Sequence, residues 1–150
     1  MRILICGDRN WDDVDSVERV VDALINKYGG DISIIQGAAS GADSIAGDVA
    51  LKKELVCVSV PAKWSKHNKA AGPIRNEYML YRCKPNFVVA FHEDLANSRG
   101  TKHMVALARK ENIFVICVRN YQEALFFKDK LVNENDDLIC QNRVTGKSRL

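Results

Sequence analysis

The sequence predicts an α/β protein in which a mostly parallel, five-stranded sheet is covered by helices on both faces. Short runs rich in Val, Ile, Leu, Phe and Cys recur along the chain and alternate with segments of helical periodicity. Nearly continuous apolar strands are typical of a sheet buried on both faces. Alternation of strands with helices favours parallel strands joined by right-handed crossovers. The expected architecture is therefore Rossmann-like and doubly wound.

Local patterns support the individual elements of this sheet. In chain order, the expected elements are strand 2–6, helix 14–28, strand 32–36, helix 41–53, strand 55–60, helix 72–83, strand 86–91, helix 101–112 and strand 113–118. Apolar residues at helical spacing run from Val14 to Ile25, and the Gly29-Gly30 pair ends that helix. Pro73 suits the first turn of the third helix.

The length of 150 residues fits one folded domain. We expect the α/β domain to occupy residues 1–120, with 121–150 attached to it as a C-terminal helix and a polar, basic tail. Residues 121–132 have the pattern of that helix. Two interpretations of the end of the chain stay open, namely a capping helix with a frayed terminus or a tail that covers a partner subunit or a ligand site.

Composition narrows the class of protein. The formal net charge of +3 is compatible with anionic ligands and does not demand nucleic acid. Cys6, Cys57 and Cys117 lie in apolar runs without C-x-x-C spacing, so we expect buried thiols rather than metal ligands. No apolar run approaches the ~20 residues that span a bilayer, and the N-terminal apolar stretch is too short for a signal peptide. We expect a cytoplasmic protein.

Ligands of open α/β sheets bind outside the carboxyl ends of the strands. The segments that follow the first four predicted strands are rich in Gly, Arg, Asn, Ser or Trp: GDRNWDD, GAASGAD, PAKWSKHNKAAGPIRNEYM and HEDLANSRGT. We therefore expect a binding site at this edge of the sheet.

The segment GAASGAD fits an anion site or a structural turn. Gly37, Ser40 and Gly41 carry little bulk, so backbone N–H groups at the start of the second helix are expected to face a phosphate. Asp43 is expected to accept hydrogen bonds from backbone N–H groups, a sugar hydroxyl or an arginine. In the structural alternative, the glycines allow close packing and Asp43 caps the helix.

The segment NSRGT also fits an anion site at the start of a helix. Gly100 and Thr101 open the fourth helix and would hold a second anionic group, while Ser98 fits either a ligand contact or an N-cap. No metal or cofactor is expected, because His92 and His103 belong to no metal-binding pattern.

Arginine and tryptophan side chains complete the expected site. Arg9 and Arg75 offer planar guanidinium groups that suit phosphate or carboxylate, and Asn76 adjoins the second of them. Trp11 and Trp64 would either stack on a base or pack over the sheet edge.

Taken together, GDRNWDD, QGAASGADSIAGDVA, PAKWSKHNKAAGPIRNEYM and SRGT resemble the SLOG superfamily, and within it the YpsA-related branch labelled DUF2493. The resemblance covers about residues 2–118. It implies a Rossmann-like domain that binds a nucleotide or nucleotide-derived ligand. The positions that carry over are Gly7, Arg9, Trp11, Gly37, Gly41, Asp43, Arg75, Asn76, Gly100 and Thr101. Asp8 and Gln36 depart from the family pattern, where serine and glycine are usual.

The resemblance implies a sensor or a sequestering protein that holds its ligand intact, and it leaves enzymatic activity open. In the wider superfamily, LOG-type phosphoribohydrolases typically show the pattern P-G-G-x-G-T-x-x-E in the loop that corresponds to SRGT. Here Met104 stands in place of the glutamate. The alternative is an N-glycosidase acting on nucleoside monophosphates or related nucleotides. Asp43 or Glu77 would then be the catalytic carboxylate that stabilises an oxocarbenium-like transition state.

A third hypothesis is a protein associated with single-stranded DNA, as some superfamily members are. Outside the C-terminal tail the sequence shows no basic stripe with interleaved aromatic residues, so nucleic acid is the least expected partner. Doubly wound proteins with an exposed helix face often pair, and we expect a homo-oligomer, either a dimer or a tetramer.

Overall fold

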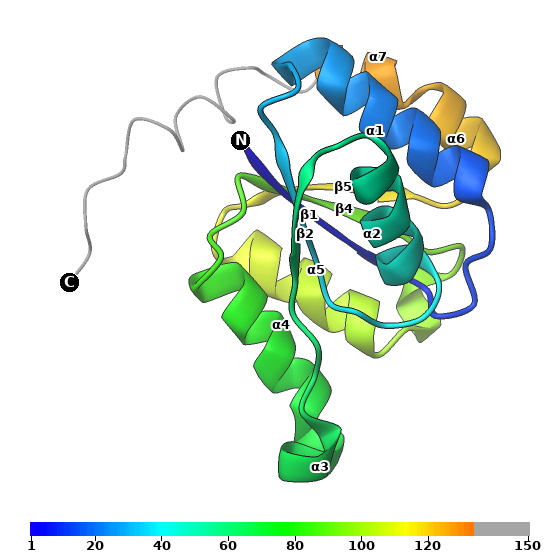
Figure 1. Cartoon of the computed structure of the whole chain (residues 1–150). Helices are drawn as coiled ribbons and strands as arrows, with labels where there is room; N and C mark the ends of the chain where they lie inside the picture. The colour runs from blue at the N-terminus through cyan, green and yellow to red at the C-terminus, as the bar shows by residue number, and fades with distance from the viewer. Residues whose placement is uncertain (134–150) are drawn as a thin grey trace.

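The chain folds into a five-stranded, all-parallel sheet with helices on both faces, which confirms the predicted fold class (Figure 1). The computed structural model describes residues 1–133. The strands are β1 Arg2–Gly7, β2 Ser33–Gln36, β3 Val56–Ser59, β4 Phe87–Phe91 and β5 Phe114–Val118, in the sheet order β3-β2-β1-β4-β5. The helices are α1 Val14–Tyr28, α2 Ala42–Lys52, α3 Trp64–His67, α4 Ala71–Tyr81, α5 Gly100–Lys110, α6 Tyr121–Leu125 and α7 Phe127–Asn133, with 3₁₀ turns η1 Asn68–Ala70 and η2 Leu95–Asn97.

The sheet separates two apolar cores. Helices α1, α2, α6 and α7 lie on one face and α4 and α5 on the other (Figure 1). Along β1, Ile3 and Ile5 point into the first core, whereas Leu4 and Cys6 point into the second. This alternation explains why β1, at the centre of the sheet, is apolar at every buried position.

The prediction that Cys57 is buried is wrong. Cys57 is exposed, not buried, because it lies in β3, which pairs with β2 on one side and forms the edge of the sheet. Val56, in the same strand, is 67% exposed. Cys6 is buried as predicted, and Cys117 in β5 is half-buried.

The segment after β5 differs from the single helix predicted at 121–132. It forms two short helices, α6 and α7, separated at Phe126. Ala124, Phe127 and Leu131 are buried in the same core as α1. The predicted polar tail from residue 134 onward lies outside the described residues. Within the part that is described, no helix is long and apolar enough to cross a membrane.

Gly41 is where the loops after β1 and β2 touch. Its φ of 76° lies in the left-handed region, and a Cβ there would overlap the carbonyl oxygen of Asp8 and come within 2.5 Å of the Arg9 carbonyl carbon. The adjacent Ala42 N–H donates to the Asp8 carbonyl at 3.1 Å, and the Asp8 N–H donates to the carbonyl of Phe91 at 2.8 Å. Three strand ends are thereby held together at one edge of the sheet.

We therefore expect Gly41→Ala to lower the free energy of unfolding by about 3 kcal/mol, since both the backbone conformation and the contact with Asp8 oppose a Cβ. Urea denaturation measures this change. Gly30→Ala is the matched control, because a Cβ at Gly30 would meet no atom within 4 Å. Equal stability of the two variants would contradict the close approach at Gly41.

Candidate functional site

A cleft of about 610 Å³ opens at the carboxyl edge of the sheet. It lies at the switch point between β1 and β4, where the chain leaves β1 for α1 on one face and leaves β4 for α5 on the other. Its walls come from the end of β1, the start of α2, the α3–α4 segment and the first turn of α5. This is the edge at which the sequence predicts a binding site.

The Asp43 carboxylate lies at the base of the cleft and is 3% exposed. Its Oδ2 accepts the Gly37 N–H at 2.9 Å, and the backbone N–H groups of Gly7 and Ala39 also hydrogen-bond to it. Burial raises the pKa of Asp43, while the Arg75 guanidinium and the three N–H groups oppose that rise. Asp43 therefore joins the ends of β1 and β2 to α2.

Arg75 supplies the counter-charge from α4. Its Nη1 donates to the carbonyl of Gly37, and its Nε donates to Oδ1 of Asn76 at 3.0 Å. Burial lowers the pKa of Arg75, and the nearby Asp43 carboxylate opposes this change. A Cβ at Gly37 would overlap the guanidinium, so glycine is required here for close packing. Both polar groups of Gly37 are thus used inside the protein.

Asn76 connects α4 to the first turn of α5. Its Nδ2 donates to the Gly100 carbonyl at 3.1 Å and lies 3.2 Å from Nδ1 of His103. The Thr101 N–H donates to Oγ of Ser98 at 3.2 Å, so the Ser98 hydroxyl satisfies a donor in the first turn of α5. The Thr101 hydroxyl makes no hydrogen bond within residues 1–133, and this hydroxyl and Gly100 line the cleft.

The rim of the cleft is cationic. The Arg9 guanidinium lies 5.4 Å from the centroid of the Trp64 ring, which is a cation–π distance, and Trp64 is 47% exposed. The cleft lining contains four basic and two acidic residues, so its formal charge is +2. The basic residues are Arg9, Lys69, Arg75 and Arg99, and the acidic residues are Asp8 and Asp43. Because Asp43 is opposed by Arg75, the excess positive charge lies at the exposed rim and suits an anion.

Asp8 and His92 form an acid–base pair that the sequence analysis did not identify. The Asp94 N–H donates to Nδ1 of His92 at 3.0 Å, which places the proton of a neutral ring on Nε2. That Nε2 lies 3.8 Å from Oδ2 of Asp8. The two residues come from the ends of β1 and β4, so only the pairing of these strands brings them together.

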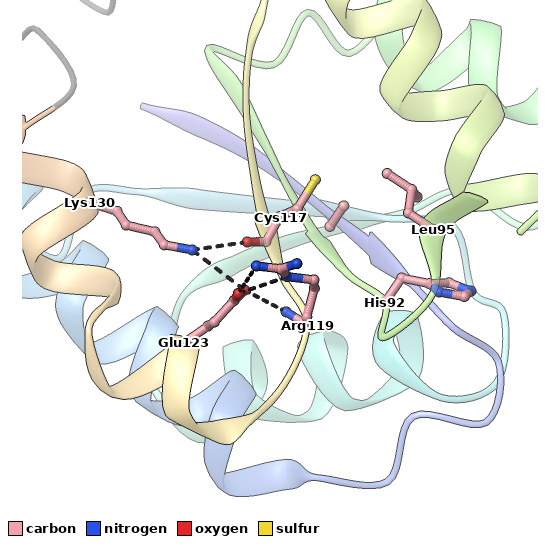
Figure 2. Close-up of a pocket in the computed structure, with 7 residues that line it drawn as sticks. His92, Leu95, Cys117, Arg119, Glu123 and Lys130 are labelled. Carbon is pink, nitrogen blue, oxygen red and sulfur yellow. Dashed lines mark hydrogen bonds and ion pairs between the residues drawn. The ribbon is translucent and has the colours of Figure 1, made fainter. Parts of the chain in front are cut away.

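His92 also borders a second pocket of about 270 Å³ beside β5 (Figure 2). There the Glu123 carboxylate lies 2.7 Å from Arg119 and 3.5 Å from Lys130. Lys130 also donates to the Cys117 carbonyl at 3.3 Å. The charges of this pocket are paired with one another, unlike those at the rim of the main cleft.

Most of the predicted site residues line the cleft: Gly7, Arg9, Asp43, Trp64, Arg75, Asn76, Ser98, Gly100 and Thr101. The cleft lining does not include Trp11, Gly37, Ser40, Gly41 or Glu77. Trp11 packs edge-on against Phe91 with 5.4 Å between ring centroids, and its Nε1 donates to Ser16 Oγ and the Asp13 carbonyl.

Two N–H groups of the GAASGAD segment are used inside the protein. The Ala42 N–H donates to the Asp8 carbonyl, and the Gly37 N–H donates to Asp43. Glu77 is exposed on α4 and is not part of the cleft lining. Lys69 and Arg99 are cleft residues that the sequence analysis missed; a signal was present, since each lies inside a motif already identified.

The structure also removes the reason for ranking nucleic acid last among partners. We call residues 61–70, which lie between β3 and α4, the arm. Lys63, Trp64, Lys66 and Lys69 of the arm are all exposed. This is a basic segment with an interleaved aromatic residue outside the C-terminal tail.

Comparison with known proteins places the chain beside a protein family, a phage protein and a solved structure. The model of the YspA, cpYpsA-related SLOG family matches residues 1–67. The Gene 61 protein of Mycobacterium phage D29 is 36% identical over 122 residues, which cover 77% of this chain and 94% of that protein. The X-ray structure of DNA processing protein A (DprA) from Streptococcus pneumoniae has a TM-score of 0.65 at 20% identity. That likeness covers 89% of this chain and 56% of the DprA chain, and it shows the fold alone.

We expect Asp43→Asn to lower the free energy of unfolding by about 3 kcal/mol, because an amide leaves a backbone donor unpaired and Arg75 without its counter-charge. Chemical denaturation at neutral pH measures the loss. Asp48→Asn is the control, since it makes the same charge change at an exposed position of the same helix. If both variants keep wild-type stability, the hydrogen bonds of Asp43 do not hold this edge together.

Proposed function

Because this chain belongs to the YspA, cpYpsA-related SLOG family, we propose that it binds a nucleotide or nucleotide-derived ligand in the cleft and holds it intact, as a sensor or sequestering protein. The observation that carries the proposal is the cationic rim of a cleft whose buried carboxylate, Asp43, accepts the Gly37 N–H and is opposed by Arg75. Such a site attracts an anion to the rim.

The side chains that line the cleft indicate where the phosphate and the base of the ligand would bind. Thr101 and Gly100, at the first turn of α5, and the exposed side of Arg75 suit a phosphate. The exposed Trp64 ring suits stacking by a base, with Arg9 between the base and the phosphate. The cleft volume of about 610 Å³ falls in the range of small-molecule sites.

Cleavage of the ligand is the alternative function. Met104 is 1% exposed and lines the cleft. It stands at the position where the LOG-type enzymes typically have a glutamate. The Asp8–His92 pair is the observation that supports an enzyme, because a carboxylate beside an imidazole can move a proton. In that case Asp8 and Asp43 are the two carboxylates of the cleft that would serve the reaction.

We also propose that the chain assembles as a homo-oligomer and that residues 121–133 belong to the same folded unit as 1–120. Ile74, Tyr78 and Tyr81 of α4 are each more than 40% exposed and recur at helical spacing. Burial of that stripe against a second copy would remove apolar surface from water. Light scattering of the purified chain measures the assembly.

The first experiment incubates the protein with nucleoside mono-, di- and triphosphates, cyclic nucleotides and NAD-derived compounds. Protein-bound and free fractions are then identified by mass spectrometry. Intact ligand in the bound fraction supports the proposed binder. A free base with a sugar phosphate in solution, absent for Asp8→Asn, establishes the hydrolase instead. If the protein neither retains nor cleaves any of these compounds, both functions are contradicted.

Arg9→Ala should weaken binding of the retained nucleotide by about tenfold or more, because a charged hydrogen bond and the support of Trp64 are lost. Titration calorimetry gives the two dissociation constants. Arg9 is a better probe than Arg75, which also holds Gly37 and balances Asp43. Arg19→Ala is the matched control, since Arg19 lies 5.3 Å over the ring of Tyr121 outside the cleft. Equal weakening by both substitutions would place the ligand elsewhere.

A further inference from the structure

We propose that the arm, residues 61–70, extends the cleft into a binding surface for a short single-stranded oligonucleotide whose terminal nucleotide occupies the cleft. This inference rests on the proposed function, because it assigns the ligand of the same site. Three properties of the arm carry it: its charge, its exposure and its aromatic side chain.

The arm is cationic without compensation. It contains three basic residues, Lys63, Lys66 and Lys69, and neither Asp nor Glu. Within residues 1–133, Lys63, Lys66 and Lys69 form no ion pair. Lys52 and Lys53, by contrast, lie beside the Glu18 carboxylate. An uncompensated cationic segment fits a polyanion.

Folding does not explain the position of the arm. Neither α3 nor η1 contains a buried residue. Figure 1 shows α3 at the end of a projection that extends away from the sheet. The arm therefore contributes little to either apolar core, and its side chains are available to a partner.

The composition favours nucleic acid over a protein partner. Trp64 is 47% exposed, and one of its contacts is the Arg9 guanidinium. An exposed aromatic ring among basic side chains is the arrangement by which single-stranded nucleic acids are held, through base stacking and phosphate contacts. Lysine, by contrast, is depleted at the centres of protein–protein interfaces.

The cationic surface is continuous with the cleft. Lys69 and Trp64 line the cleft itself, whereas Lys63 and Lys66 lie on the arm outside its lining. A strand whose end is held at Arg75 and Thr101 would pass Trp64 and reach these two lysines. The cleft has the volume of a small-molecule site, which suits one unpaired nucleotide rather than a base-paired duplex.

The test titrates the protein with 5′-phosphorylated deoxyadenosine oligonucleotides of one, two, four and eight nucleotides at several salt concentrations. We expect affinity to rise by about tenfold or more between one and four nucleotides, because stacking and phosphate contacts are added. The slope of log affinity against log salt should steepen by about 0.7 for each added phosphate that is contacted.

Paired variants locate the effect. Lys63→Gln with Lys66→Gln should abolish most of the gain with length and leave mononucleotide affinity unchanged, since neither lysine lines the cleft. Lys110→Gln with Lys128→Gln is the control, because it removes two exposed lysines from α5 and α7 and gives the same net charge. Circular dichroism melting checks that both double variants fold.

Each outcome decides between the two proposals. Mononucleotide binding without a gain with length, or an equal loss in the control variant, overturns the role of the arm and leaves the proposed function intact. Tight oligonucleotide binding that depends on Lys63 and Lys66, without mononucleotide binding, supports the arm and contradicts a free nucleotide as ligand. Tighter binding of a duplex of equal length overturns the single-strand assignment. Absence of binding by every ligand contradicts both.

Discussion

The Asp43 carboxylate is buried where β1 and β2 end, and three backbone N–H groups from those strand ends and the following loop donate to it. A charged group out of water is costly unless its hydrogen bonds and its counter-charge are in place. The loops after both strands and the guanidinium of Arg75 must therefore take the positions that satisfy it. Arg75 in turn lies over Gly37, where a side chain would not fit. The geometry of the whole cleft depends on this one buried charge.

This constraint divides the polar residues of the site into two layers. The inner layer is committed to the protein: Asp43 to backbone N–H groups, and Asn76 to the first turn of α5. The outer layer, represented by Arg9 and Thr101, keeps donors that face the cleft. A rigid inner layer pre-organises the outer one, which lowers the conformational cost of binding a ligand.

The same division bears on chemistry. The Gly37 N–H and the nearby Arg75 give Asp43 a structural role at the base of the cleft. The second carboxylate of the cleft is that of Asp8, which stands at the position where the resembled family has serine. Its neighbour His92 comes from β4, across the switch point of the sheet. A binding cleft and a latent acid–base pair thus occupy the same edge.

The sequence by itself determined the nature of the elements and the edge of the sheet that carries the site. Helix 14–28 was predicted at its observed bounds, because apolar periodicity and glycine stops are local signals. Only the tertiary structure decided that Cys57 lies on an exposed edge strand, that the Ala42 N–H at the start of α2 donates to Asp8, and that the arm projects from the body. Each of these depends on which strands become neighbours and which distant groups meet, and such long-range pairing leaves no mark on local periodicity.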